Sequence, residues 1–153
     1  AYSYYTVIGG KKSLVYEEPA FTKTDSPLIV DNPLDKVWIK MQEEYPNASA
    51  IEVHPPEKAD GIIAANANLG KGTYWQTDYR YFDPYTLEEK EVEHIYGKLD
   101  HATASDKIMR MNYDIHTGAI MGLPGKIFAF LISLLIASLP VTGFLIWWGK
   151  RNK

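Results

Sequence analysis

The sequence predicts an α+β fold, a small antiparallel sheet with a packed helix, followed by one C-terminal transmembrane α-helix. Three observations lead to this prediction. Residues 127–148 contain no charged side chain, residues 33–45 repeat apolar side chains at helical spacing, and residues 74–82 alternate with the period of a strand. One helix with several antiparallel strands is typical of a small two-layer domain.

The uncharged stretch IFAFLISLLIASLPVTGFLIWW, residues 127–148, is long enough to cross a bilayer. At about 1.5 Å per residue it spans roughly 33 Å, and the hydrocarbon core is about 30 Å thick. A buried helix of a soluble core is the alternative, but such a helix normally carries a polar stripe. Pro140 should kink the helix because it removes a backbone hydrogen bond, and a neighbouring helix could accommodate the kink.

The flanks of this stretch predict its orientation. Trp147 and Trp148 suit an aromatic belt, and the basic tail 149–153 follows directly. Basic residues close to a membrane end favour the cytoplasm, so residues 1–115 should lie on the opposite side. Because no signal peptide precedes such an external domain here, we expect this chain to be the C-terminal part of a longer membrane protein.

Composition excludes several classes of function. Residues 1–126 carry 13 Lys and Arg against 19 Asp and Glu, a net charge of −6. An acidic domain without a basic stripe argues against a nucleic-acid partner. The chain has no cysteine, which excludes disulfides, thiolate metal sites and cysteine nucleophiles.

The first 30 residues are rich in Tyr, Val, Thr and Ile and are predicted to form strands around the turn at Gly9 and Gly10, before a proline-rich loop at 19–33. Tyrosine clusters usually pack in cores or at edges, so we expect that role, and not ligand binding, for three of these side chains: Tyr2, Tyr4 and Tyr5.

The next segment is the clearest soluble helix. Pro33 suits its first position, with Asp31 or Asn32 as the N-cap, and it should end near Tyr45, before Pro46. Four apolar side chains share one face, and the largest, Trp38, is predicted to anchor the helix in the core: Leu34, Val37, Trp38 and Met41.

Several strands should follow, at 48–54, 61–68, 73–82 and 87–93. Residues 94–112 then link the domain to the membrane through a short helix capped by Ser105 or Asp106. The expected divisions are a domain at 1–112, an interfacial segment at 113–126, the membrane helix at 127–148 and the basic tail at 149–153.

Known catalytic motifs are absent: the sequence contains no GxSxG, HExxH, P-loop or GxGxxG. His54, His94 and His101 lack ligand spacing and are interpreted as solvated surface residues. The acidic run at 88–93 is interpreted as a solvated edge. We therefore predict no catalytic residue and no metal site formed by this chain alone.

The segment DIHTGAIMGLPGKI, residues 114–127, is the exception. His116 should lie at the outer membrane interface, and Gly118 and Gly122 form a small-xxx-small pattern that would let a helix or a flat cofactor approach. An imidazole in this setting suits a haem ligand. The alternative is an interfacial histidine that bonds a neighbouring group, with the glycines serving helix packing alone.

At these residues the chain resembles the PepSY-associated transmembrane family of bacterial membrane proteins. The resemblance rests on DIHTGAIMGLPGKI, on Thr142 and Gly143, and on the closing FLIWWGKRNK. Upstream, the helix at 33–45 and the segment FDPYTLEEKE are similar to a PepSY domain, although Leu87 and Glu88 stand where that family has a glycine.

The resemblance implies a bacterial inner-membrane protein with several spans and periplasmic PepSY segments, linked to iron uptake. It implies a ferric-siderophore reductase that moves electrons through haem b, with His116 as one axial ligand and the second ligand outside this chain. The expected partners are the membrane, other helices of the same longer protein and a ferric siderophore. The alternative is a non-catalytic PepSY module, binding, inhibitory or structural, anchored to the membrane.

Overall fold

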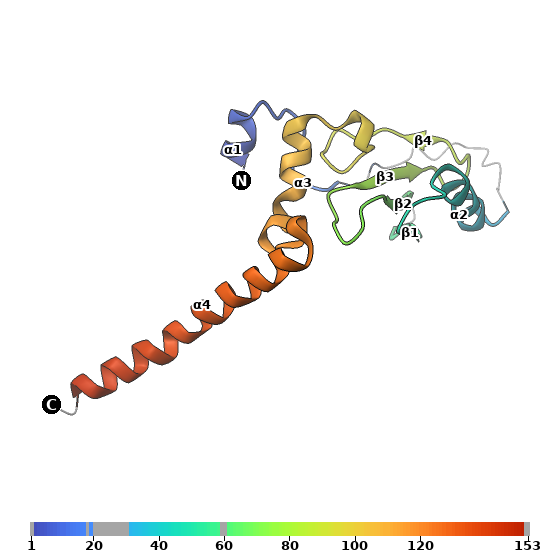
Figure 1. The fold of residues 1–153 in the computed structure, drawn as a ribbon. Coiled ribbons are helices and arrows are strands. Elements are labelled where there is room, and N and C mark those ends of the chain that lie inside the picture. The colour runs from blue at the N-terminus through green and yellow to red at the C-terminus, as the bar shows by residue number, and fades with distance from the viewer. Residues whose placement is uncertain (1, 18, 20–30, 59–60, 152–153) are drawn as a thin grey trace. The chain divides into compact units, whose positions relative to one another are not determined.

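The computed structural model of the chain describes residues 2–17, 19, 31–58 and 61–151 (Figure 1). The chain divides into two compact units, residues 1–111 and residues 112–153. The first contains a four-stranded antiparallel sheet with a helix, and the second contains a long apolar helix. The predicted fold class is therefore confirmed.

The sheet is an antiparallel meander in the order β1-β2-β3-β4. Its strands are β1 (Ala50–His54), β2 (Ile63–Asn68), β3 (Thr77–Phe82) and β4 (Glu89–Lys90). Three of the predicted strands are found, with shorter bounds, and the fourth contracts to two residues. The predicted start of β3 was wrong because residues 74–77 form a turn, in which the Thr77 amide donates to the Tyr74 carbonyl at 3.1 Å.

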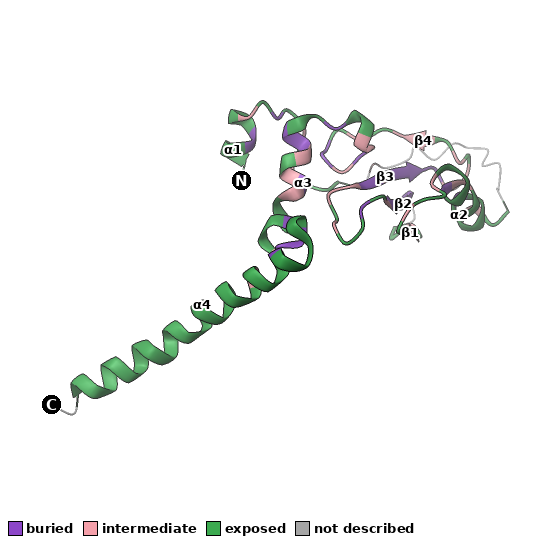
Figure 2. Ribbon diagram, in the orientation of Figure 1, coloured by how far each residue is buried: buried purple, intermediate pink, exposed green. Residues whose placement is uncertain are grey.

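Helix α2 (Pro33–Glu44) packs against one face of the sheet. Burial is concentrated on β2 and β3, as Figure 2 shows. The core on this face consists of six buried side chains: Val37, Met41, Ile63, Ala65, Ala67 and Phe82. Trp38 is 41% exposed, so its predicted core role was wrong. Val37 and Met41 form the centre of the buried stripe, which leaves Trp38 at its edge.

The opening segment forms a helix where strands were predicted. Helix α1 (Tyr2–Val7) is followed by a turn at Gly9, whose φ of 87° lies in the left-handed region that glycine tolerates. Tyr2 and Tyr4 are exposed, whereas Tyr5 is buried and donates a hydrogen bond to the Asp106 carboxylate. This distant contact outweighs the local strand preference of the sequence. The rest of the predicted N-terminal strand and loop region lies partly outside the described residues.

Helix α3 (Ala104–His116) follows the short 3-10 helix η1 (Leu99–His101). Its N-terminus is closed by a reciprocal pair of hydrogen bonds. The Thr103 amide donates to Asp106 Oδ2 at 2.9 Å, and the Asp106 amide donates to Thr103 Oγ1 at 3.2 Å. Thr103 is therefore the capping residue, and Asp106 contributes from the third helical position, as in a capping box.

The second unit contains the 3-10 helix η2 (Ala119–Met121) and helix α4 (Gly122–Arg151). The apolar window of this helix is 0% buried within the described chain. Soluble proteins rarely expose an apolar surface of this extent. Its length and composition suit a membrane span, and the helix begins five residues before the predicted bound at 127.

Candidate functional site

The face of the sheet opposite α2 is lined by tyrosines. Register aligns His54, Ala64, Tyr81 and Lys90 in one cross-strand row on this face. Because side chains alternate along a strand, Tyr79 shares the face with Tyr81, whereas Asp78 and Arg80 point to the α2 side. We call this surface the tyrosine face.

His94 is packed among the rings of this face. The centroid of its ring lies 5.4 Å from Tyr16, 5.8 Å from Tyr81 and 6.0 Å from Tyr96. The Tyr96 amide donates to Nδ1 at 3.1 Å, so Nε2 carries the proton that it donates to the Glu17 carbonyl, also at 3.1 Å. His94 is 4% exposed, and burial lowers its pKa.

The predicted surface position of His94 was therefore wrong. The reason is a contact between segments far apart in the chain: Ser13 and His94 form a parallel β-bridge, which brings residues 13–17 beside 93–95. The periodicity of the sequence contains no signal for a single bridge of this kind.

Two hollows open on the tyrosine face, and Tyr79 lines both. The first has a volume of about 490 Å³ and is lined by Lys12, Tyr79, Tyr81, Glu89, Lys90, Glu91, Val92, Gly97, Lys98 and His101. The second has a volume of about 420 Å³ and is lined by Tyr16, His54, Pro55, Glu57, Ala64, Asn66 and Tyr79. Both volumes lie in the range of small-molecule sites.

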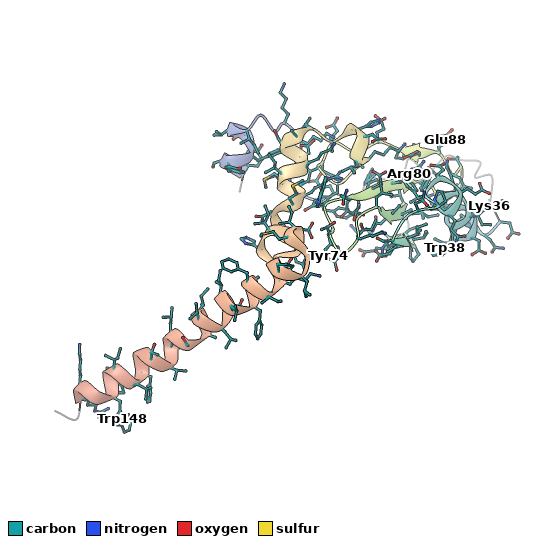
Figure 3. All side chains as sticks on the ribbon, in the orientation of Figure 1. Lys36, Trp38, Tyr74, Arg80, Glu88 and Trp148 are labelled. Atoms are coloured by element: carbon teal, nitrogen blue, oxygen red, sulfur yellow. The ribbon has the colours of Figure 1, made fainter. Side chains whose placement is uncertain are left out.

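A network of ion pairs around Arg80 lies on the α2 side of the sheet. Arg80, labelled in Figure 3, is 4% exposed. It donates to both carboxylate oxygens of Glu89, at 2.8 and 2.6 Å, and to Glu44. Burial lowers the pKa of Arg80, but its hydrogen bonds to the two carboxylates outweigh burial and leave the pKa raised. The pKa of Glu89 is lowered: burial raises it, and the bonds from Arg80 and Lys98 more than compensate.

Arg110 ties a loop to the sheet through hydrogen bonds to backbone carbonyls. Its guanidinium donates to the carbonyls of Ile95 at 2.7 Å, Gly97 at 2.7 Å and Thr77 at 3.1 Å. Residues 95–97 are thereby held against β3, and Gly97 borders the first hollow. Neither this clamp nor the Arg80 network was predicted, because the partners are separated along the chain.

His116, the residue predicted to bind haem, is the last residue of α3 and is exposed. The four histidines are not gathered: within the described residues, no group of three or more His, Asp or Glu side chains could hold a metal ion. His54 lies 3.4 Å from Glu52, and His101 lines the first hollow.

The glycines near His116 build a turn and not a helical groove. Gly118 has a φ of 71°, and a Cβ there would lie 2.2 Å from the Gly125 carbonyl oxygen. A Cβ on Gly125 would in turn lie 2.2 Å from the Gly118 oxygen. A Cβ on Gly122, whose φ is 67°, would meet no neighbouring heavy atom of the described chain within 4 Å. The predicted small-xxx-small surface is therefore wrong, since η2 interrupts the helix and Gly118 packs against Gly125.

One imidazole, that of His116, belongs to the second unit. His116 is exposed and able to act as one axial ligand, and exposed apolar side chains lie nearby in sequence, at Ile115, Ile120, Met121 and Leu123. The other three histidines belong to the first unit.

A family model described as the PepSY-associated TM region matches residues 20–150. The chain belongs to this family. The match covers both the sheet domain and the apolar helix, and identifies a membrane-associated, PepSY-containing protein. A search of curated proteins found no match.

Proposed function

We propose that this PepSY protein is the periplasmic domain and a membrane helix of a multi-span bacterial inner-membrane protein, and that it takes part in haem-mediated electron transfer to ferric chelates. His116 would provide one axial ligand and a helix outside this chain the other. When bound, a haem b would supply a one-electron carrier. This chain's own contribution is to hold the His116 imidazole next to the membrane segment.

The observation that carries this proposal is the accessibility of His116. Its side chain is exposed at the end of α3, six residues before α4 begins. Among the chain's four histidines it is also the only one in the second unit. A b-type site needs a neutral imidazole in an apolar setting, and bilayer or neighbouring helices would supply that setting around His116.

The test is haem-replete expression of the full-length protein, followed by absorbance spectroscopy and ferric-chelate reduction. His116→Ala should remove the Soret absorbance of one haem and abolish reduction, while membrane insertion persists because α4 is unchanged. The matched controls His54→Ala and His101→Ala alter exposed residues of the first unit and should leave the spectrum unchanged. A His116→Ala protein with full haem content and full reduction rate would refute the proposal.

The orientation of the chain in the membrane is part of the same proposal. Lys150 and Arg151 follow the apolar run, which favours a cytoplasmic C-terminus and a periplasmic sheet domain. An alkaline phosphatase fusion after residue 151 should be inactive, and a fusion after residue 111 should be active. The opposite pattern would contradict the orientation.

A second candidate is a non-catalytic binding module anchored to the membrane. The specific observation in its favour is the tyrosine face, which carries two hollows of ligand size. No Soret band after haem-replete expression, together with specific ligand binding by the domain, would support this candidate over electron transfer.

A further inference from the structure

We propose that the first hollow of the tyrosine face, bordered by β3, β4 and residues 97–101, binds a small organic anion with an aromatic group. The inference concerns the first unit alone and does not depend on haem binding. Its volume of about 490 Å³ suits a small molecule, because ligand sites commonly enclose about 300–1,000 Å³.

The strand register distinguishes the two charged residues of β4, both of which line this hollow. Lys90 is the direct cross-strand partner of Tyr81, so its side chain stands on the tyrosine face. The neighbouring Glu89 pairs with Phe82 and turns to the α2 side, where Arg80 binds both of its oxygens. Both residues of β4 line the hollow, but the Glu89 carboxylate is held by Arg80 and Lys98, whereas Lys90 forms no ion pair with the described residues.

Three lysines, Lys12, Lys90 and Lys98, form the rim of the hollow, and carboxylates neutralise their charges only in part. Lys98 Nζ lies 2.9 Å from Glu89, a carboxylate that it shares with Arg80. Lys12 Nζ donates to the His101 carbonyl at 3.1 Å and lies 3.8 Å from Asp106. Lys90 has no ion-pair partner within the described parts of the chain. Glu91 is the one further carboxylate of the lining, and it is exposed beyond the end of β4.

This cationic rim is unusual for the domain, which is acidic as a whole. Three lysines of the domain and His101 line this one hollow. Lysine rims recognise carboxylates and other anions through charge-assisted hydrogen bonds. The same hollow is lined by Tyr79 and Tyr81, whose rings offer contact area for a planar group. Both features together select an aromatic anion over an inorganic ion.

The first experiment uses the full chain in detergent micelles and three probes: naphthoate, its neutral analogue naphthamide, and inorganic phosphate. Calorimetric titration should show saturable binding of naphthoate, at least tenfold weaker binding of naphthamide, and weakening of naphthoate binding by added salt. Equal affinity for naphthamide, or no saturable binding, would overturn the proposal. Displacement of naphthoate by equimolar phosphate would also overturn it, since the site would then recognise charge alone.

The second experiment assigns the site to Lys90. Lys90→Gln should weaken naphthoate binding roughly ten- to a hundredfold, the usual effect of losing one charge-assisted hydrogen bond. Lys90→Arg, which retains the charge, should bind within about twofold of the parent chain. The matched control is Lys36→Gln, which removes an exposed lysine of α2, on the other side of the sheet. Equal weakening by Lys36→Gln and Lys90→Gln would refute the assignment to this hollow.

Discussion

The two faces of the sheet differ in what covers them. On one face, α2 buries a continuous apolar cluster around Met41 and Phe82, with the Arg80 network beside it. On the other face, loop segments carrying Tyr16 and His94 lie among tyrosine rings and leave two hollows open. A helix can fill a sheet face with interlocking side chains, whereas short loop segments cannot. The first face therefore carries the larger buried apolar cluster, and the second keeps open space between its side chains.

The largest expected effect belongs to the α2 face. Phe82 is fully buried between the sheet and α2. Phe82→Ala should lower the free energy of unfolding by roughly 3–5 kcal/mol, because it removes a large side chain and leaves a cavity. Urea unfolding of the full chain in detergent, followed by far-ultraviolet circular dichroism, measures this change.

Trp38→Ala provides the control on the same element. Trp38 is 41% exposed, so the substitution should cost distinctly less than Phe82→Ala. If Trp38→Ala proved as costly as Phe82→Ala, the assignment of the core to Val37 and Met41 would fail.

An intermediate effect is expected at the charged network. Arg80→Met retains an unbranched apolar stem and removes the charge, which leaves Glu44 and Glu89 without their buried partner. Breaking a buried ion pair costs about 3–5 kcal/mol, but both carboxylates are partly exposed to solvent, at 43% and 24%. We therefore expect a loss of roughly 1–3 kcal/mol in the same unfolding measurement. Lys36→Met, on the exposed side of α2, should change stability very little, and an equal loss there would contradict a specific role for Arg80.

The smallest effect should appear on the tyrosine face as a dependence on pH. Burial lowers the pKa of His94 in the folded chain below its ordinary value of about 6.5. As the pH falls through about 6.5, the unfolded chain therefore binds a proton at His94 before the folded chain does. Stability should be fully present above that pH and should fall as the pH is lowered toward the folded pKa, by at most about 1.4 kcal/mol per pH unit. Thermal unfolding measured between pH 7.5 and pH 5.5 tests this expectation.

The groups around His94 explain the direction of the change. Protonation would add a hydrogen to Nδ1, which now accepts a hydrogen bond from the Tyr96 amide, so two N–H groups would face each other. It would also add a positive charge near Arg110 and Lys12. His94→Gln should flatten the fall in stability, whereas His54→Gln, at an exposed position, should leave it in place. An unchanged slope in His94→Gln would assign the pH dependence to other groups.

The local pattern of apolar residues in the sequence was sufficient to predict part of this fold. The strands β1, β2 and β3 and the helix α2 were predicted from alternation, helical spacing and the turn residues between them, with bounds that differ by a few residues. The same pattern misplaced Trp38, because helical spacing identifies a stripe of residues but not which of them lies at its centre. The tyrosine-rich opening was predicted as strands, and the contact of Tyr5 with Asp106 accompanies a helix there.

The sequence by itself determined the α+β class, the apolar helix and its basic flank, because these depend on composition and on neighbours within a few turns. The sequence also singled out His116, whose role in haem binding remains a prediction. Only the tertiary structure decided that His94 is buried, that Gly118 packs against Gly125, and that Lys90 and Lys98 border one hollow. Each of these depends on the pairing of residues separated in the chain, and such pairing is selected by the packing of the whole domain.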